Sequence, residues 1–189
     1  AGTGMDALTH CIETFLSPAV NPPAEAIALD GLARAAANIE RATHEGSDRR
    51  ARWEMMMAAM EGALAFQKGL GAVHAMSHPL GALPGKPLHH GTLNAVILPT
   101  VLAFNADHVG DKYERIRRVV GLPAGTDLAE WTRRLNRRLG LPGSLRAMGV
   151  VEADLEGLPE RAERDHCNAT NPRPATAADY ARLYREALA

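Results

Sequence analysis

The sequence is poor in aromatic residues, which make up only 4% of its 189 residues although 46% are hydrophobic. Runs of β-branched residues are also few, whereas alanine is abundant. Sandwiches and barrels draw their cores from β-branched and aromatic side chains, so this balance favours packed helices. A chain of this length can bury the core of one domain, and we expect a single all-α domain over residues 1–189.

Neither the charge nor the cysteine content points to a nucleic acid, a membrane or an oxidising compartment. The formal net charge is −1, which gives no attraction to nucleic acid or to an anionic membrane. No apolar run reaches the length of a membrane span. Cys11 and Cys167 are too few for a disulfide framework, so we expect a cytoplasmic protein. Because the chain starts at Ala1, just ahead of a predicted helix, we expect it to begin inside a longer protein.

Apolar periodicity, capping residues and proline or glycine breaks predict a series of helices and no strand of convincing length. A histidine-rich helix starts near residue 71 and is kinked or ended at Pro79. Residues 83–88 are expected to form a loop, and residues 168–174 an extended polar loop. The other predicted helices span 3–17, 24–43, 49–68, 92–105, 112–120, 127–139 and 177–188, with short pieces at 141–148 and 152–164.

Two groups of side chains stand out from this helical background. Methionines gather at positions 55, 56, 57 and 60, and we interpret them as adaptable core packing rather than as a cofactor site. The basic runs 115–118 and 133–138 are interpreted as solvated helix faces. Neither group is interpreted as a ligand-binding site.

Histidines are concentrated between Gly71 and Asn94, a segment that holds four of the eight in the chain. These four are His74, His78, His89 and His90. Single histidines on helices are usually packing or surface residues, and His44, His108 and His166 are interpreted in that way. Four within such a short segment rich in glycine and proline are harder to explain by packing, so a metal site and ordinary packing both stay open.

A second set of potential ligands lies at the start of the chain. Asp6 and His10 are four residues apart, and Glu13 follows on the same helical face. Side chains four apart on a helix can bind one metal ion together, and His74 and His78 form a second pair with this spacing. Imidazole nitrogens with one carboxylate suit Fe(II), Zn, Co, Ni or Mn better than calcium. If one coordination position stayed open, the ion would act as a Lewis acid toward a substrate oxygen.

These segments resemble the iron-containing (group III) alcohol dehydrogenases. Residues 1–13 follow the A-x-x-x-x-D-A-L-x-H-x-x-E segment of that family. Residues 69–95 follow its G-L-G-x-x-H-A-x-x-H-P-L-G and H-G-x-x-N-A segments. Shorter matches are I-L-P at 97–99, F-N at 104–105 and N-P-R at 171–173, so the resemblance spans essentially the whole chain.

The resemblance implies roles for five residues. The metal ligands of the family correspond to Asp6, His10, His74 and His90. His78 corresponds to a histidine near the nicotinamide, which implies a catalytic and cofactor-binding role in proton relay or in orienting cofactor and substrate.

The identity of the fourth ligand depends on the spacing of the histidines. His90 is preferred to His89 because it directly precedes the glycine of the H-G-x-x-N pattern. The segment between His78 and His90 is longer than the family pattern, so His89 stays open as an alternative ligand.

The resemblance also implies a fold and partners. Family members have an N-terminal dinucleotide-binding α/β domain and then a helical, bundle-like metal domain of the dehydroquinate-synthase type. This chain resembles only the second domain, and it contains no glycine-rich phosphate loop after a predicted strand. We therefore expect a dinucleotide-binding domain as partner and a possible homodimer, and we expect the chain alone to be inactive.

The implied activity is the reversible oxidation of an alcohol to an aldehyde or ketone with NAD or NADP, using Fe(II), zinc or another divalent ion. Three alternatives stay open: a maleylacetate-reductase-like or glycerol-dehydrogenase-like enzyme, a metal-dependent hydrolase, and a non-catalytic metal-binding helical fragment. Maleylacetate reductases tend to lack the carboxylate found here at Asp6, which favours the metal-dependent branch. The sequence does not identify the alcohol, nor does it distinguish iron from zinc or NAD from NADP.

Overall fold

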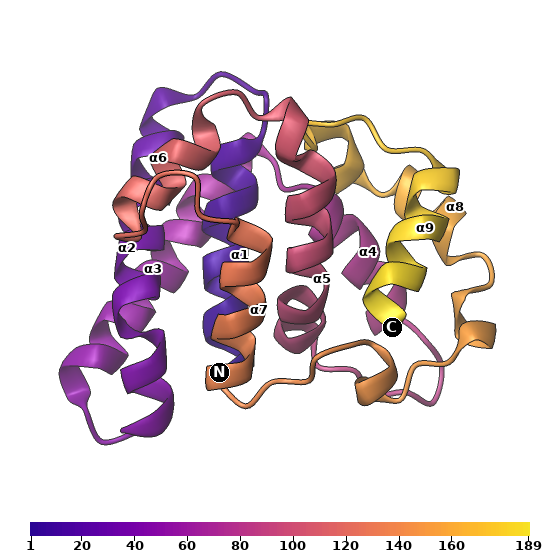
Figure 1. Cartoon of the computed structure of the whole chain (residues 1–189), viewed down its shortest axis with the longest axis horizontal. Coiled ribbons are helices and arrows are strands. Elements are labelled where there is room, and N and C mark those ends of the chain that lie inside the picture. The colour runs from indigo at the N-terminus through magenta and orange to yellow at the C-terminus, as the bar shows by residue number, and fades with distance from the viewer.

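Every regular element of the protein is a helix (Figure 1), as the composition predicts. The computed structural model describes all 189 residues. The α-helices are α1 (Gly2–Leu16), α2 (Pro22–His44), α3 (Arg49–Ala65), α4 (Ala72–Gly81), α5 (His90–Asn105), α6 (Lys112–Val119), α7 (Leu128–Arg138), α8 (Leu158–Arg164) and α9 (Ala177–Leu188). Short 3-10 turns are η1 (Phe66–Lys68), η2 (Ala106–His108), η3 (Arg146–Met148), η4 (Glu152–Leu155) and η5 (His166–Thr170).

Local capping explains where several helices begin. The side chain of Asn21 accepts from the backbone N–H of Ala24 at the start of α2. Asp48 does the same for Ala51 at the start of α3. The side chain of Thr176 accepts from the backbone N–H of Asp179 at the start of α9, and the carboxylate of Asp179 accepts from the backbone N–H of Thr176. Such caps satisfy N–H groups that have no partner within the helix, so the sequence fixes these starts locally.

Helices α1 and α5 form the centre of the packing. Helices α2 and α3 pack against α1 on one side, while α5 contacts α1, α4, α7 and α9 (Figure 1). Most side chains of α5 are buried, which requires a helix that is apolar nearly all round. Helices α4, α8 and α9 form the other side of the molecule, with α4 packed against α5 and α8.

Two lysines hold the carboxyl end of α1. The buried ammonium group of Lys68 donates to the carbonyls of Thr14 and Ser17. Lys112 donates to the carbonyl of Ser17 over 2.9 Å. These carbonyls have no helical N–H partner, and the cations also match the negative end of the helix dipole. This end of α1, the helix that carries Asp6 and His10, is therefore fixed.

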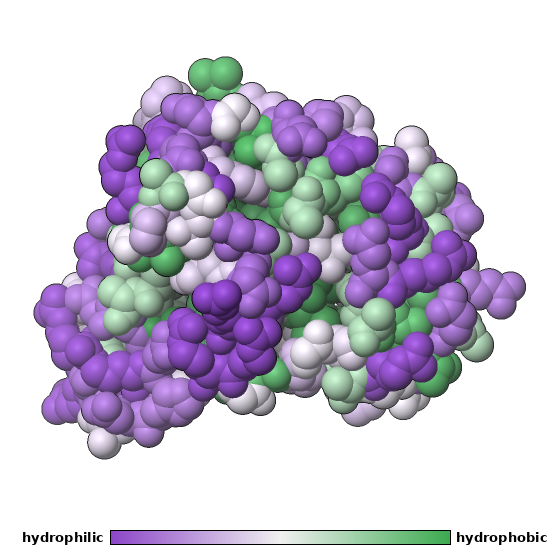
Figure 2. Space-filling model, viewed as in Figure 1, coloured by the Kyte–Doolittle hydropathy of each residue, from purple (hydrophilic) through white to green (hydrophobic).

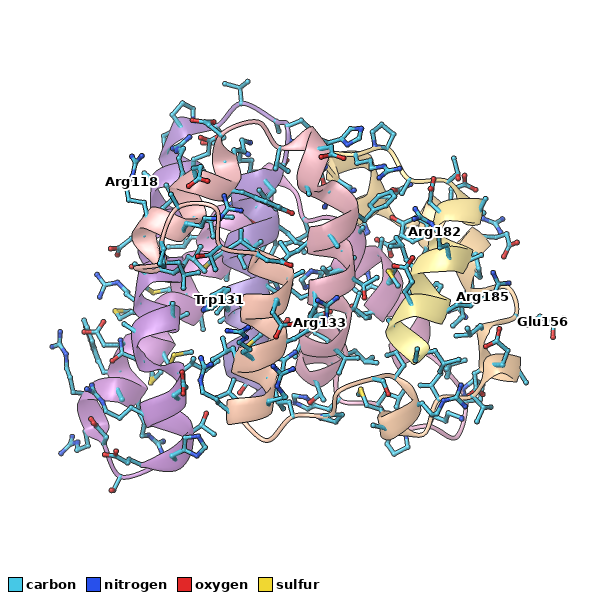
Figure 3. The ribbon with its side chains drawn as sticks, viewed as in Figure 1. Arg118, Trp131, Arg133, Glu156, Arg182 and Arg185 are labelled. Atoms are coloured by element: carbon cyan, nitrogen blue, oxygen red, sulfur yellow. The ribbon has the colours of Figure 1, made fainter.

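The surface confirms one interpretation and corrects two others. In the basic run 115–118, the side chain of Arg117 is only 14% exposed, and its Nε donates to the carbonyl of Thr126. The side chains of 133–138 that bear guanidinium groups are exposed, as expected of a solvated helix face. Figure 2 shows hydrophilic residues over much of this face, and Figure 3 places Arg118 and Arg185 at the periphery. The methionine interpretation is wrong in part, because Met56 and Met60 are 69% and 49% exposed. They lie on the face of α3 that no other helix covers.

Several boundaries differ from those predicted: of 141–148 only Arg146–Met148 is helical, 152–164 is divided into η4 and α8, and α5 begins at His90 rather than at residue 92. Helix α3 ends at Ala65 rather than near residue 68, because the chain tightens into η1. The expected polar loop at 168–174 begins inside the 3-10 turn η5. Helix α4 continues two residues past Pro79 to Gly81. None of the helices combines the length and the apolar character needed to cross a membrane.

Candidate metal centre

Three helices bring together the four residues for which the resemblance implies metal ligation. Asp6 and His10 lie on α1, His74 on α4 and His90 at the start of α5. The Nε2 atoms of His10, His74 and His90 lie 3.7, 3.7 and 3.5 Å from Oδ1 of Asp6. A tetrahedral ion with bonds of about 2.0–2.1 Å separates its ligand atoms by about 3.4 Å. Ligand atoms of Asp6, His74 and His90 all lie within 4.8 Å of one another and so could hold one divalent ion. His10, whose Nε2 is close to the same carboxylate oxygen, is the fourth candidate.

The four donors differ in their access to solvent. The side chain of His74 is only 2% exposed, whereas that of His90 is 43% exposed. The side chains of Asp6 and His10 lie between these limits. A ligand can therefore approach the centre from the side of His90.

The charges of the site are suited to a cation. Burial raises the pKa of Asp6, but hydrogen bonds and the neighbouring histidines more than offset it and lower the value to about 2. Burial lowers the pKa of His10 and of His90, which favours the neutral imidazole, the form that can bind a metal ion. For His74, hydrogen bonds to Asp6 and Glu13 outweigh burial and raise the pKa to about 9. A divalent ion would replace the proton that His74 otherwise carries.

Glu13 orients His74 from the side away from Asp6. Its Oε2 is hydrogen-bonded to Nδ1 of His74, and its Oε1 accepts from the backbone N–H of Val73 over 2.7 Å. A carboxylate bonded to one ring nitrogen fixes the ring and leaves the other nitrogen for a metal. The sequence places Glu13 on the face of Asp6 and His10, but it gives no sign of this partner.

Asn94 lies at the middle of the donor set. Its Nδ2 is 2.7 Å from Oδ1 of Asp6 and 3.1 Å from the Nε2 atoms of His74 and His90. The side chain is fully buried, one turn after His90 on α5. From the sequence, Asn94 has no role beyond its place in the H-G-x-x-N pattern. The four-residue spacing from His90 to Asn94 is the feature of the sequence that indicates this contact, because it puts the amide and the imidazole on one face of the helix.

Gly91 allows α5 to approach α1 closely enough to form the site. A Cβ atom at this position would lie 2.3 Å from the carbonyl oxygen of Gly2 and 3.1 Å from Cβ of Asp6. The first contact is with backbone, which cannot move aside as a flexible side chain can. The glycine after His90 is therefore required by the contact between the two helices.

The remaining histidines of the segment have separate places. His89 accepts from the backbone N–H of Thr92 over 3.2 Å and so caps α5, which leaves His90 as the member of the pair at the centre. His78 lies one turn after His74 on α4, with its ring centroid 5.9 Å from that of His90. Its Nδ1 is 2.9 Å from Oδ2 of Asp165, a partner that the sequence did not reveal.

Comparison with known proteins places this arrangement in a family. The profile of the Fe-containing alcohol dehydrogenase family, C-terminal, matches residues 1–188. The chain is 55% identical over 195 aligned positions to a 4-hydroxybutyrate dehydrogenase of Cupriavidus necator, covering all of this chain and 51% of that protein. It is 36% identical to a 1,3-propanediol dehydrogenase of Klebsiella pneumoniae, covering 100% of this chain and 50% of that protein.

A solved structure shows the same fold. The crystal structure of a 1,3-propanediol oxidoreductase superposes with a TM-score of 0.92 at 36% identity, covering all of this chain and 51% of that one. The chain thus spans about half the length of the relatives it matches. The profile match and these likenesses show that the chain belongs to the Fe-containing alcohol dehydrogenase family and corresponds to its C-terminal, all-helical part.

Proposed function

We propose that the protein containing this chain is a metal-dependent dehydrogenase that reversibly oxidises an alcohol to an aldehyde or ketone with NAD or NADP. The chain, as one domain, supplies the metal centre through Asp6, His10, His74 and His90. The observation that carries this proposal is the convergence of one carboxylate oxygen and three imidazole nitrogens within 3.5–3.7 Å of that oxygen. Their charges leave the site in need of a cation.

When bound there, a divalent ion supplies a Lewis acid that polarises a substrate oxygen. Iron is the ion we propose on family grounds, with zinc as the alternative that the same ligands accept. Residues around the ion orient its ligands: Glu13 is hydrogen-bonded to His74, and Asn94 donates to Asp6. Burial of His74 keeps water from one side of the centre.

His78 is the residue we propose for proton transfer. It is not among the four donors, but its ring lies beside His74 and His90 with centroids 5.8 and 5.9 Å away. Its side chain is 36% exposed, so a substrate hydroxyl can reach it. An imidazole in this place can accept the hydroxyl proton as the alcohol is oxidised and return it in the reverse reaction.

The remaining half of the protein is proposed to hold the dinucleotide. A nicotinamide accepts the hydride in this chemistry, and the chain has no phosphate-binding loop of its own. We propose that a dinucleotide-binding domain lies next to His78, in a cytoplasmic enzyme that can form a homodimer. Because the chain is 55% identical to a 4-hydroxybutyrate dehydrogenase, 4-hydroxybutyrate is the first substrate to test.

Two variants of the complete protein, Asp6→Ala and His74→Ala, test this proposal. We expect both to lose bound metal, measured by elemental analysis after purification without air, together with NAD(P)-dependent oxidation of 4-hydroxybutyrate and other short alcohols. His108→Ala, at an exposed histidine, is the control and is expected to keep both properties. Retention of metal and activity in the two test variants would show that the centre is wrongly assigned. Hydrolysis without nicotinamide would indicate a metal-dependent hydrolase, and metal without any activity would indicate a structural site.

A further inference from the structure

Asp165 is the carboxylate nearest to the proposed proton-transfer residue. It lies after the end of α8, and its Oδ2 is 2.9 Å from Nδ1 of His78 on α4. This is the only hydrogen bond that the side chain of His78 makes with the protein. The two ring nitrogens lie on opposite edges of an imidazole, so Nε2 points away from Asp165 and has no protein partner.

Asp165 is itself held in place and charged. Its Oδ1 accepts from the backbone N–H of Cys167 over 2.9 Å, and its side chain is only 14% exposed. Burial raises the pKa of this carboxyl, but the hydrogen bonds from Cys167 and His78 outweigh burial and lower it. An ionised carboxylate can only accept hydrogen bonds, so the proton of this contact belongs to Nδ1 of His78.

We propose that Asp165 is a positioning residue for His78, an inference that rests on the proton-transfer role proposed above. It holds the imidazole in the tautomer with hydrogen on Nδ1, and this leaves the lone pair of Nε2 free to accept the substrate proton. The carboxylate also stabilises the imidazolium that forms when Nε2 takes that proton. Carboxylate–imidazole pairs act in this way elsewhere, where a wrong tautomer alone can cost activity about 10⁴-fold.

A different use of the same residues is a second metal site. Ligand atoms of His78, Asp165 and Cys167 lie within 4.8 Å of one another. However, the Cys167 side chain is buried, and its sulfur already has a partner in Nε2 of His166 at 3.4 Å. The contact between His78 and Asp165 is also at hydrogen-bond distance, which favours the positioning role.

The variant Asp165→Asn tests the proposal because it keeps the shape of the side chain but has one acceptor oxygen instead of two. If that oxygen accepts from Cys167, the amide group faces Nδ1 of His78 and forces the proton to Nε2. We expect kcat of the complete enzyme to fall by at least about a hundredfold. KM should stay within about twofold and metal content should not change. Glu163→Gln, which removes an exposed charge from α8, is the matched control and should behave as the wild type.

The tautomer can be measured without any assay of activity. In the complete protein, labelled with ¹⁵N-histidine and loaded with one equivalent of Zn²⁺, the signals of His78 are assigned by their loss in His78→Gln. We expect a protonated Nδ1 in the wild type and a protonated Nε2 in Asp165→Asn. A wild-type proton on Nε2, or the same tautomer in both proteins, would overturn the proposal, and so would a second Zn²⁺ bound through Cys167 and lost in Cys167→Ser. Unchanged kcat in His78→Gln would instead refute the proton-transfer role of His78, whatever the tautomer.

Discussion

Asn105, the last residue of α5, and Asn171 exchange two side-chain hydrogen bonds. Nδ2 of Asn105 donates to Oδ1 of Asn171 over 3.0 Å, and Nδ2 of Asn171 donates to Oδ1 of Asn105 over 2.9 Å. Oδ1 of Asn171 also accepts from the backbone N–H of Ala72 at the start of α4. The F-N and N-P-R segments, far apart in sequence, therefore meet to hold the first turn of the helix that carries His74.

Replacing Asn171 by alanine should destabilise the protein substantially. The change leaves the N–H of Ala72 and the amide of Asn105 buried without partners, and each such group costs about 1–3 kcal/mol. We expect the free energy of unfolding in urea, followed by circular dichroism, to fall by about 2–4 kcal/mol. Asn38→Ala is the control, because Asn38 is half-buried and donates only within its own helix. Equal losses in the two variants would contradict the role given to Asn171.

Gly91→Ala should damage the metal centre although it replaces none of the four proposed ligands. The new methyl group would lie 2.3 Å from the carbonyl oxygen of Gly2, so α1 and α5 must separate and carry Asp6 away from His90. We expect a loss of stability of about 1–3 kcal/mol and a marked loss of metal affinity by titration calorimetry. Gly46→Ala is the matched control, because a Cβ atom there has no neighbour within 4 Å. Metal affinity equal to that of the control would show that the close approach of these helices is not required.

Glu13→Gln should weaken metal binding while the four donors stay in place. The glutamine keeps one acceptor oxygen, so either His74 or the backbone N–H of Val73 loses its partner. Changes to groups that orient a metal ligand typically cost about 10–100-fold in affinity, and we expect a loss in that range. Glu45→Gln removes the same charge from an exposed turn and serves as the control. Affinity equal to that of the control would mean that Glu13 does not orient His74.

The helices could be predicted from the sequence because their causes are local. The caps at Asn21, Asp48 and Thr176 lie within four residues of the N–H groups they satisfy. Apolar periodicity, which is also a local property of the sequence, predicts which face of each helix is buried. Periodicity does not say whether a second face of a helix is covered, so the sequence does not reveal that Met56 and Met60 of α3 are exposed.

The candidate site was predictable only as far as its residues share a helix or a known motif. Asp6 and His10 are four residues apart, about one turn of the same helix, so the sequence pairs them. The resemblance to a known family implies that His74 and His90 are further ligands. Asp165 lies 87 residues from His78, and nothing near either residue in sequence pairs them. Such partners depend on which helices pack together, and this is decided by the whole core rather than by local pattern.

Metal affinity should rise with pH up to about 9. His74 has its pKa raised to about 9 by Asp6 and Glu13, so at neutral pH it is protonated without metal and must lose that proton to bind an ion. Binding therefore releases about one proton, and affinity should increase about tenfold per pH unit below this value. Titration calorimetry with Zn²⁺ in buffers of different ionisation enthalpy measures the proton release. Affinity that does not change between pH 6.5 and 8 would contradict this assignment.

Pro99 and Asn136 should be energetically coupled although they lie on different helices. Proline has no N–H, so Pro99 leaves the carbonyl of Ala95 on α5 without its helical partner. Nδ2 of Asn136 on α7, itself buried, donates to that carbonyl over 2.6 Å.

A double-mutant cycle measures this coupling. We expect Asn136→Ala to cost about 1–3 kcal/mol in the free energy of unfolding, because the carbonyl is left buried and unpaired. In a Pro99→Ala background the N–H of the new alanine can bond to Ala95, so the same change should cost at least about 1 kcal/mol less. Thermal or urea unfolding of the four proteins gives the coupling energy. Additive costs would show that the amide of Asn136 does not replace the helical hydrogen bond that Pro99 removes.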